Sequence, residues 1–101
     1  MFVGVARFDL HIPQSGSLKE KRAVLRPVVE RVRNRLHVSV AEVDHQDLWQ
    51  RAAVGVTCVS ASSDQCRKVL QEVEKVLGRA SLEGAEVTER SIRVVSMEDL
   101  D

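Results

Sequence analysis

Residues 2–25 read FVGVARFDLHIPQSGSLKEKRAVL, and within this stretch the spacing of the apolar residues changes from two to three or four. From Phe2 to Ile12 every even-numbered residue is apolar or glycine, whereas the odd-numbered residues are mixed. This alternation is typical of a strand with one face in the core, and it predicts a strand over residues 2–12. The mixed face is expected to lie against water or a partner.

A turn and a helix follow this strand. Residues 13–16 (PQSG) break the alternation, and Ser17 followed three residues later by Glu20 is the capping-box pattern that places a helix start at Leu18. Apolar residues then recur at helical spacing and form one stripe: Leu18, Leu25, Val29, Val32 and Leu36. Pro27 lies inside this helix, where it removes a hydrogen bond, so we expect a kink or two abutting helices.

The rest of the chain completes a βαββαβ order. Alternating or continuous apolar residues predict further strands at residues 37–44, 52–60 and about 86–96. Ser63 or Asp64 can cap a second helix that ends at Gly78. Its apolar face comprises Cys66, Val69, Leu70, Val73, Val76 and Leu77. This order predicts an α+β, ferredoxin-like sandwich, with a four-stranded antiparallel sheet and both helices on one face.

The composition is that of an ordinary globular protein. The chain has 101 residues, of which 44% are hydrophobic and 30% charged, and its formal net charge is zero. We expect one domain over residues 1–101, with residues 96–101 as an acidic C-terminal tail. No apolar run approaches the roughly 20 residues that span a bilayer. The N-terminus has no signal-peptide pattern and the two cysteines suggest no disulfide framework, so a cytoplasmic location is expected.

The charges are distributed unevenly along the chain. Residues 1–37 carry 8 basic groups and 3 acids, whereas residues 38–101 carry 7 basic groups and 12 acids. Such a split suggests either an anionic partner for the first half or electrostatic pairing between the two halves. The sequence leaves both alternatives open.

The first helix concentrates the positive charge. At about 100° per residue, four cations fall on one flank of its apolar stripe: Lys19, Arg22, Arg26 and Arg33. Lys21 falls on the other flank. These side chains either cover the edge of the core with their stems or contact a phosphate backbone, in which case Lys21 would assist the other four.

No group of residues predicts catalysis. Asp44, His45 and Asp47 could attract a metal, but they lie in a polar loop without a strong ligand spacing, so no metal or cofactor is expected. Cys58 and Cys66 fall on apolar faces and suggest small core residues rather than nucleophiles. We therefore expect a protein that is not an enzyme.

Two surfaces suggest a protein partner. Trp49, the only tryptophan, lies in the predicted loop, where it either folds over the sheet edge or anchors an interface. The outward face of the sheet carries Val3, Val5 and Val59, which is apolar for a surface. A second copy could cover it, so we expect a homodimer.

Three stretches resemble the YlxP-like family of small bacterial proteins, which is catalogued as a domain of unknown function. They are residues 17–22 (SLKEKR), 34–44 (NRLHVSVAEVD) and 46–52 (QDLWQRA), and the resemblance extends over about residues 2–95. It implies a bacterial cytosolic protein with a ferredoxin-like fold. It also implies association with RNA or the ribosome, since the family's genes often lie among those for translation initiation and ribosome maturation. Pro27 departs from the family's usually unbroken helix.

The leading hypothesis is therefore a non-enzymatic protein that binds RNA or the ribosome through the first helix. The alternative is a dimeric regulatory module that binds a small ligand at the turn over residues 13–17. A third hypothesis is an enzyme, which only a pocket lined by Asp44, His45 and Asp47 would favour. The family resemblance supplies no catalytic residues for it.

Overall fold

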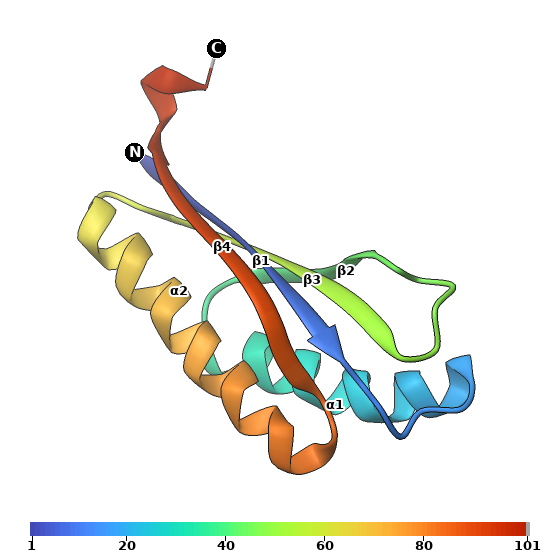
Figure 1. Ribbon diagram of the computed structural model, residues 1–101. Coiled ribbons are helices and arrows are strands. Elements are labelled where there is room, and N and C mark those ends of the chain that lie inside the picture. Colours follow the sequence, from blue (N-terminus) through green and yellow to red (C-terminus); the bar gives the residue numbers. More distant parts are fainter. Residues whose placement is uncertain (101) are drawn as a thin grey trace.

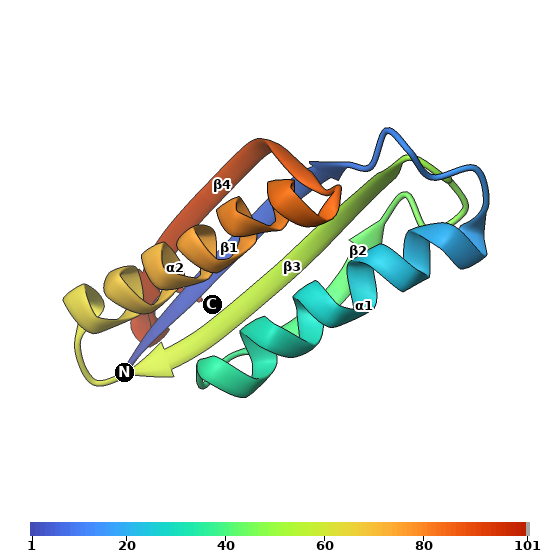
Figure 2. The ribbon, with the colours of Figure 1, turned by 90° about the horizontal axis from the view of Figure 1, so that it is seen from below.

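A computed structural model describes residues 1–100 as one antiparallel sheet with two long helices on one of its faces (Figures 1 and 2). The main elements are β1 (Phe2–His11), α1 (Leu18–Arg35), β2 (Ser39–Asp44), β3 (Arg51–Ser60), α2 (Ser63–Gly78) and β4 (Glu86–Ser96). The strand order is β2-β3-β1-β4, and every neighbouring pair is antiparallel. The predicted ferredoxin-like α+β fold is confirmed.

The core lies between the sheet and the helices, and β1 runs through its centre. Ala6, Phe8, Leu10 and Ile12 are all buried, as their even-numbered positions predicted. Phe8 pairs with Val54 of β3 on one side and with Arg90 of β4 on the other. Neither α1 nor α2 covers the opposite face of the sheet (Figure 1).

Helix α1 begins where the capping box predicted. The Ser17 hydroxyl oxygen accepts a hydrogen bond from the Glu20 N–H at 3.0 Å, and the Glu20 carboxylate accepts one from the Gly16 N–H at 2.6 Å. The helix then runs without interruption past Pro27, so the alternative of two abutting helices is wrong. Pro27 has no N–H group, so the Ala23 carbonyl loses its helical hydrogen bond. Both residues are exposed, and water can therefore satisfy that carbonyl.

Helix α2 ends at Gly78 as predicted, but its N-cap differs from the prediction. Its N-cap is Ser62, whose hydroxyl accepts from the Gln65 N–H at 3.3 Å, so capping by Ser63 or Asp64 was wrong. Gly78 keeps helical torsion angles, and the chain continues directly into a 3-10 helix, η1 (Arg79–Glu83). The left-handed residue that ends this segment is Gly84, with φ of 98°.

The C-terminal segment begins with a short 3-10 turn. A 3-10 turn, η2 (Met97–Asp99), follows β4, and the Met97 N–H donates to the Met1 carbonyl at 2.9 Å. Asp101, the last residue of the expected acidic tail, lies outside the described residues. None of the helices in residues 1–100 has the length and apolar character needed to cross a membrane.

Gly4 allows α2 to approach β1 closely, and this contact is testable. A Cβ atom at Gly4 would lie 2.9 Å from both Cys58 Sγ and Leu70 Cδ1, whereas a Cβ at Gly78 would meet nothing within 4 Å. We expect Gly4→Ala to lower the free energy of unfolding by about 1–3 kcal/mol through overpacking. Gly78→Ala should raise it by about 0.5–1 kcal/mol, because alanine restricts the unfolded chain and suits a helix. Urea unfolding measures both, and equal midpoints for the two variants would contradict the packing argument.

Candidate nucleic-acid interface

The basic flank predicted from the sequence lies on the outer face of α1. Lys19, Arg22 and Arg26 are exposed, and none of them forms an ion pair with any residue of the part of the chain that the structure describes. Arg33, the fourth member, is tied down. Its guanidinium lies 2.6 Å from the Glu30 carboxylate and donates to the Val40 carbonyl at 2.9 Å.

The three unpaired cations surround an open hollow of about 560 Å³ on the helix surface. Ala23 and Pro27 supply its apolar part, and Glu30 is its one acidic residue. This side of α1 faces away from the sheet, so nothing in the described chain covers it (Figure 2). We call Lys19, Arg22 and Arg26 together the basic face.

Acids of the second half neutralise other cations of the first half. Within residues 1–100, three ion pairs join the two halves: Arg7 with Asp44 at 3.2 Å, Lys21 with Glu42 at 3.0 Å and Arg31 with Glu83 at 2.6 Å. The sequence left open whether such pairing masks the basic helix. These pairs neutralise Lys21 and Arg31 of α1 and leave the three cations of the basic face unpaired within residues 1–100.

Lys21 does not belong to this surface. Its side chain is 1% exposed, and its Nζ atom donates to three carbonyl oxygens, those of His45 at 2.8 Å, Arg51 at 3.1 Å and Gln46 at 3.4 Å. Glu42 Oε2 lies 3.0 Å from the same Nζ, and this ion pair is the only polar contact of that buried oxygen within residues 1–100. The expectation that Lys21 assists in contacting phosphates is therefore wrong.

The sequence held a signal for this burial. Leu18 and Leu25 are seven positions apart in the apolar stripe, and Lys21 and Arg22 lie between them, one on each side of the stripe. In the strand β2, Glu42 alternates with the buried Val40 and therefore points inward. An inward acid is thus the one signal for a buried cation, but it favours Lys21 only once the position of β2 beside α1 is known.

The turn before α1 is already satisfied by its own residues. Glu20 occupies the Gly16 N–H, and the Ser15 hydroxyl donates to the Ser17 carbonyl at 2.9 Å. The positive end of the helix thus meets a carboxylate of its own chain. No described contact favours the small-ligand site expected at residues 13–17.

The connection between β2 and β3 forms a second candidate surface, which we call the arm (residues 45–50). Lys21 holds its start, where His45 adopts a left-handed φ of 60°, and Gln50 holds its end. The Gln50 Nε2 atom donates to the carbonyls of Pro13 and Ser15, both at 3.2 Å. The backbone carbonyl of Gln50 accepts a hydrogen bond from the Ile12 N–H at 2.8 Å. The arm is therefore fixed to both α1 and the preceding turn.

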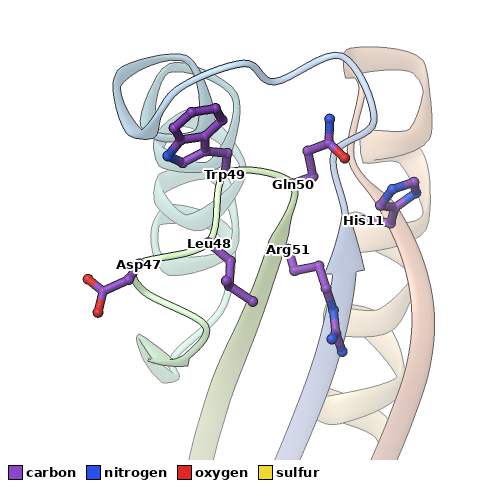
Figure 3. Close-up of a pocket in the computed structure, with 6 residues that line it drawn as sticks. All are labelled: His11, Asp47, Leu48, Trp49, Gln50 and Arg51. Carbon is purple, nitrogen blue, oxygen red and sulfur yellow. The ribbon is translucent and has the colours of Figure 1, made fainter.

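The arm presents Trp49 to solvent. This side chain is 55% exposed, which an interface anchor requires and which folding over the sheet edge would not give. It borders a pocket of about 450 Å³ (Figure 3). The pocket is lined by His11, Asp47, Leu48, Trp49, Gln50 and Arg51. His11 and Arg51 are cross-strand partners at the ends of β1 and β3.

The polar loop at the start of the arm is an ion-paired turn. The Asp44 carboxylate accepts from the His45 N–H at 2.8 Å and from Arg7 at 3.2 Å, and both contacts, the first more strongly, lower the pKa of Asp44. Within residues 1–100, no three His, Cys, Asp or Glu side chains lie together in a way that could hold a metal ion. Burial raises the pKa of the Cys58 thiol, which keeps it protonated.

The open face of the sheet carries an exposed apolar group. Val5 and Val59 are 48% and 67% exposed, and Val43, which the sequence did not single out, is 51% exposed beside them. Val3 is only half-buried on the same face. A hollow of about 320 Å³ lies between Val5 and Val43, over Gly55.

Comparison with known proteins places the chain in a family. A family model described as "Protein of unknown function (DUF503)" matches residues 3–92. The chain belongs to the DUF503 family. The "Uncharacterized protein YlxP" of Bacillus subtilis (strain 168) is 46% identical over 71 residues, which is 70% of this chain and 77% of that protein. The resemblance inferred from the three sequence stretches is confirmed.

Solved structures that resemble this member of the DUF503 family share its fold at low sequence identity. A de novo designed protein with ferredoxin fold, LFR1 1, matches 100% of this chain and 88% of its own, with a TM-score of 0.51 and 6% identity. A C-terminal segment of the alpha subunit of aIF2 from Pyrococcus abyssi matches 94% of this chain, with a TM-score of 0.51 and 16% identity. The chain spans 51% of that segment's length. These likenesses show the fold alone.

The buried ion pair gives a direct test of how the arm is held. Lys21→Met keeps the apolar stem but leaves Glu42 and three carbonyls without their ammonium partner. We expect the free energy of unfolding to fall by about 3–5 kcal/mol, as for other broken buried pairs. Lys19→Met, two residues away on the exposed face, should change it by less than about 0.5 kcal/mol. Urea unfolding of both variants measures the difference, and a small loss for Lys21→Met would show that the ammonium does not hold the arm.

Proposed function

We propose that the protein is a non-enzymatic RNA-associated protein that contacts phosphates of ribosomal RNA through the basic face of α1. The observation that carries the proposal is that Lys19, Arg22 and Arg26 stay exposed and unpaired within residues 1–100, although the chain as a whole has a net charge of zero. Arg33 extends the same flank, with part of its charge held by Glu30. A cytoplasmic location would follow from such a partner.

The chemistry of this face suits a phosphate backbone better than a specific small anion. Arginine and lysine stems around an apolar hollow can follow neighbouring phosphates without a fixed geometry. Each phosphate that such a cation neutralises releases counterions, so affinity depends steeply on salt and little on sequence. The translation-related setting implied by the family resemblance also supports RNA as the polyanion.

The basic face predicts a measurable salt dependence. For three or four phosphate contacts we expect the logarithm of the binding constant to fall with the logarithm of the salt concentration with a slope of about −2 to −4. The double variant Arg22→Glu/Arg26→Glu should weaken binding and reduce the magnitude of this slope by about 2. Fluorescence anisotropy with a labelled ribosomal RNA fragment measures both quantities.

The matched control reverses two exposed cations outside α1. Lys68→Glu/Arg79→Glu makes the same change in net charge, and neither residue has an ion pair in the described part of the chain. The control should keep the slope of the unaltered protein and lose only the small affinity due to net charge. A flat salt response, or an equal loss in the two double variants, would refute the proposal.

We also propose that a second copy of the chain covers the open face of the sheet. Val5, Val43 and Val59 are exposed apolar side chains on one face, where Arg7 is bonded to Asp9 at 3.1 Å and to Asp44 at 3.2 Å. Arg93, the cross-strand partner of Val5, has no ion pair within residues 1–100, so a second copy has to leave it at a hydrated rim or supply an acid for it. A twofold arrangement would place the same patch on both sides.

The dimer is tested by a charge placed in the apolar group. Val5→Glu and Val59→Glu should shift the protein from dimer to monomer, because each would place two carboxylates in a dry interface. Leu82→Glu, at a 91% exposed position in η1, should leave the dimer intact. Light scattering coupled to gel filtration measures the mass. A monomeric unaltered protein at the highest soluble concentration would dismiss this interface.

A further inference from the structure

The arm holds the only tryptophan of the chain in a fixed and exposed position. Exposed large aromatic side chains usually fold back onto the core when their support is flexible. Here the support is rigid, because Lys21 binds the first residues of the arm and Gln50 binds the last. Trp49 therefore stays exposed on a support that does not need to be ordered when a ligand binds.

Polar residues line the pocket together with Trp49. In Figure 3, Trp49 and His11 lie on either side of Gln50, while the Arg51 side chain extends along the sheet, away from the indole. Arg51 has no ion pair within residues 1–100, and the Gln50 amide uses its nitrogen on Pro13 and Ser15, which leaves Oε1 as an acceptor. An aromatic face with hydrogen-bonding groups at its edge is how proteins recognise an unstacked base.

We propose that the Trp49 pocket takes one unstacked base of a single-stranded RNA segment. The inference rests on the proposed function and adds the class of RNA, since a base inside a duplex cannot stack on a side chain. Phe2 and Phe8 lie toward the core and the chain has no tyrosine, so Trp49 is the aromatic residue available for stacking.

The position of the arm connects this pocket with the basic face. Figures 1 and 2 both place the arm and the first turns of α1 at the same end of the molecule. Lys21 binds the arm on the inner side of α1, whereas Lys19 and Arg22 lie on other sides of the same turns. A strand with phosphates on Lys19 and Arg22 would therefore bend around the first turns of α1 to place a base in the pocket.

Two acids lie near the pocket and limit what it can bind. Asp47 lines it, but its carboxylate points away from Arg51 and His11 in Figure 3. Glu86 is the cross-strand partner of His11 on β4. The immediate surroundings of the base are therefore close to neutral, which suits a nucleobase more than a phosphate group. The phosphates belong on α1.

The single tryptophan makes the test specific, because its fluorescence reports this site alone. A single-stranded oligonucleotide should quench the Trp49 emission, and the same sequence in a duplex should bind with little quenching. Trp49→Ala should weaken single-strand binding by about 5- to 150-fold, the loss of one base–aromatic stack, and leave duplex binding unchanged. Trp49→Phe should retain most of the affinity, measured by anisotropy of the labelled RNA.

Leu82→Ala is the control, because it removes an exposed apolar side chain that does not line the pocket and leaves the aromatic ring in place. It should leave the preference for single strands intact. Equal quenching by a free nucleoside monophosphate at the same nucleotide concentration would overturn the proposal in favour of a nucleotide site. Emission that changes with protein concentration alone would overturn it in favour of contact with a second copy.

The outcomes separate this inference from the proposed function. If Arg22→Glu/Arg26→Glu abolishes RNA binding while Trp49→Ala has no effect on single strands, the base pocket is refuted and the basic face stands. If no RNA binds at any salt concentration, the proposed function fails first. Urea midpoints equal to that of the unaltered protein confirm that the Trp49 variants remain folded.

Discussion

The buried ammonium group of Lys21 is the interaction that holds the arm against α1, β2 and β3. A charge that leaves water is tolerated only when its donors are matched, and here three carbonyls and the Glu42 carboxylate surround it. These acceptors come from β2, from the arm and from the start of β3. One side chain of α1 thus joins the arm to α1, β2 and β3, and the arm needs this attachment because it buries little apolar surface of its own.

The same helical geometry that turns Lys21 inward turns the basic face outward. At about 100° per residue, Lys19 and Arg26 lie roughly opposite Lys21 on the helix, so none of the three can exchange roles without rotating the whole element. The ion pairs from Arg7 and Arg31 to acids of the second half take up the cations beside the core. The polarity of the chain is therefore partly cancelled within the fold, and what remains uncancelled on α1 is concentrated on its outer face.

The order of elements and the start of α1 could be predicted because local patterns determine them: the alternation in β1, the capping box at Ser17 and the stripe on α2. The orientation of α1 could not. Its buried residues are Lys21, Leu25, Val28 and Val32, so the core side is rotated by roughly 40° from the purely apolar stripe, toward a lysine. A pattern that counts only apolar residues cannot detect this rotation, because the partner that makes Lys21 an interior residue lies in another element. Gly78 ends α2 with helical torsion angles, and the left-handed turn that a C-terminal glycine usually makes is at Gly84 instead.

The exposure of Trp49 has the same origin. In the sequence, folding of Trp49 over the sheet and its display to a partner were equal alternatives, because nothing within the arm decides between them. Contacts with other segments keep Trp49 exposed, because Lys21 fixes the start of the arm to α1 and Gln50 fixes its end to the turn before α1. Any shift of α1 therefore moves the carbonyls of the arm that are attached to it. Lys21 sets the position of the arm relative to α1, and a leucine at this position could not do so because it has no donor for those carbonyls.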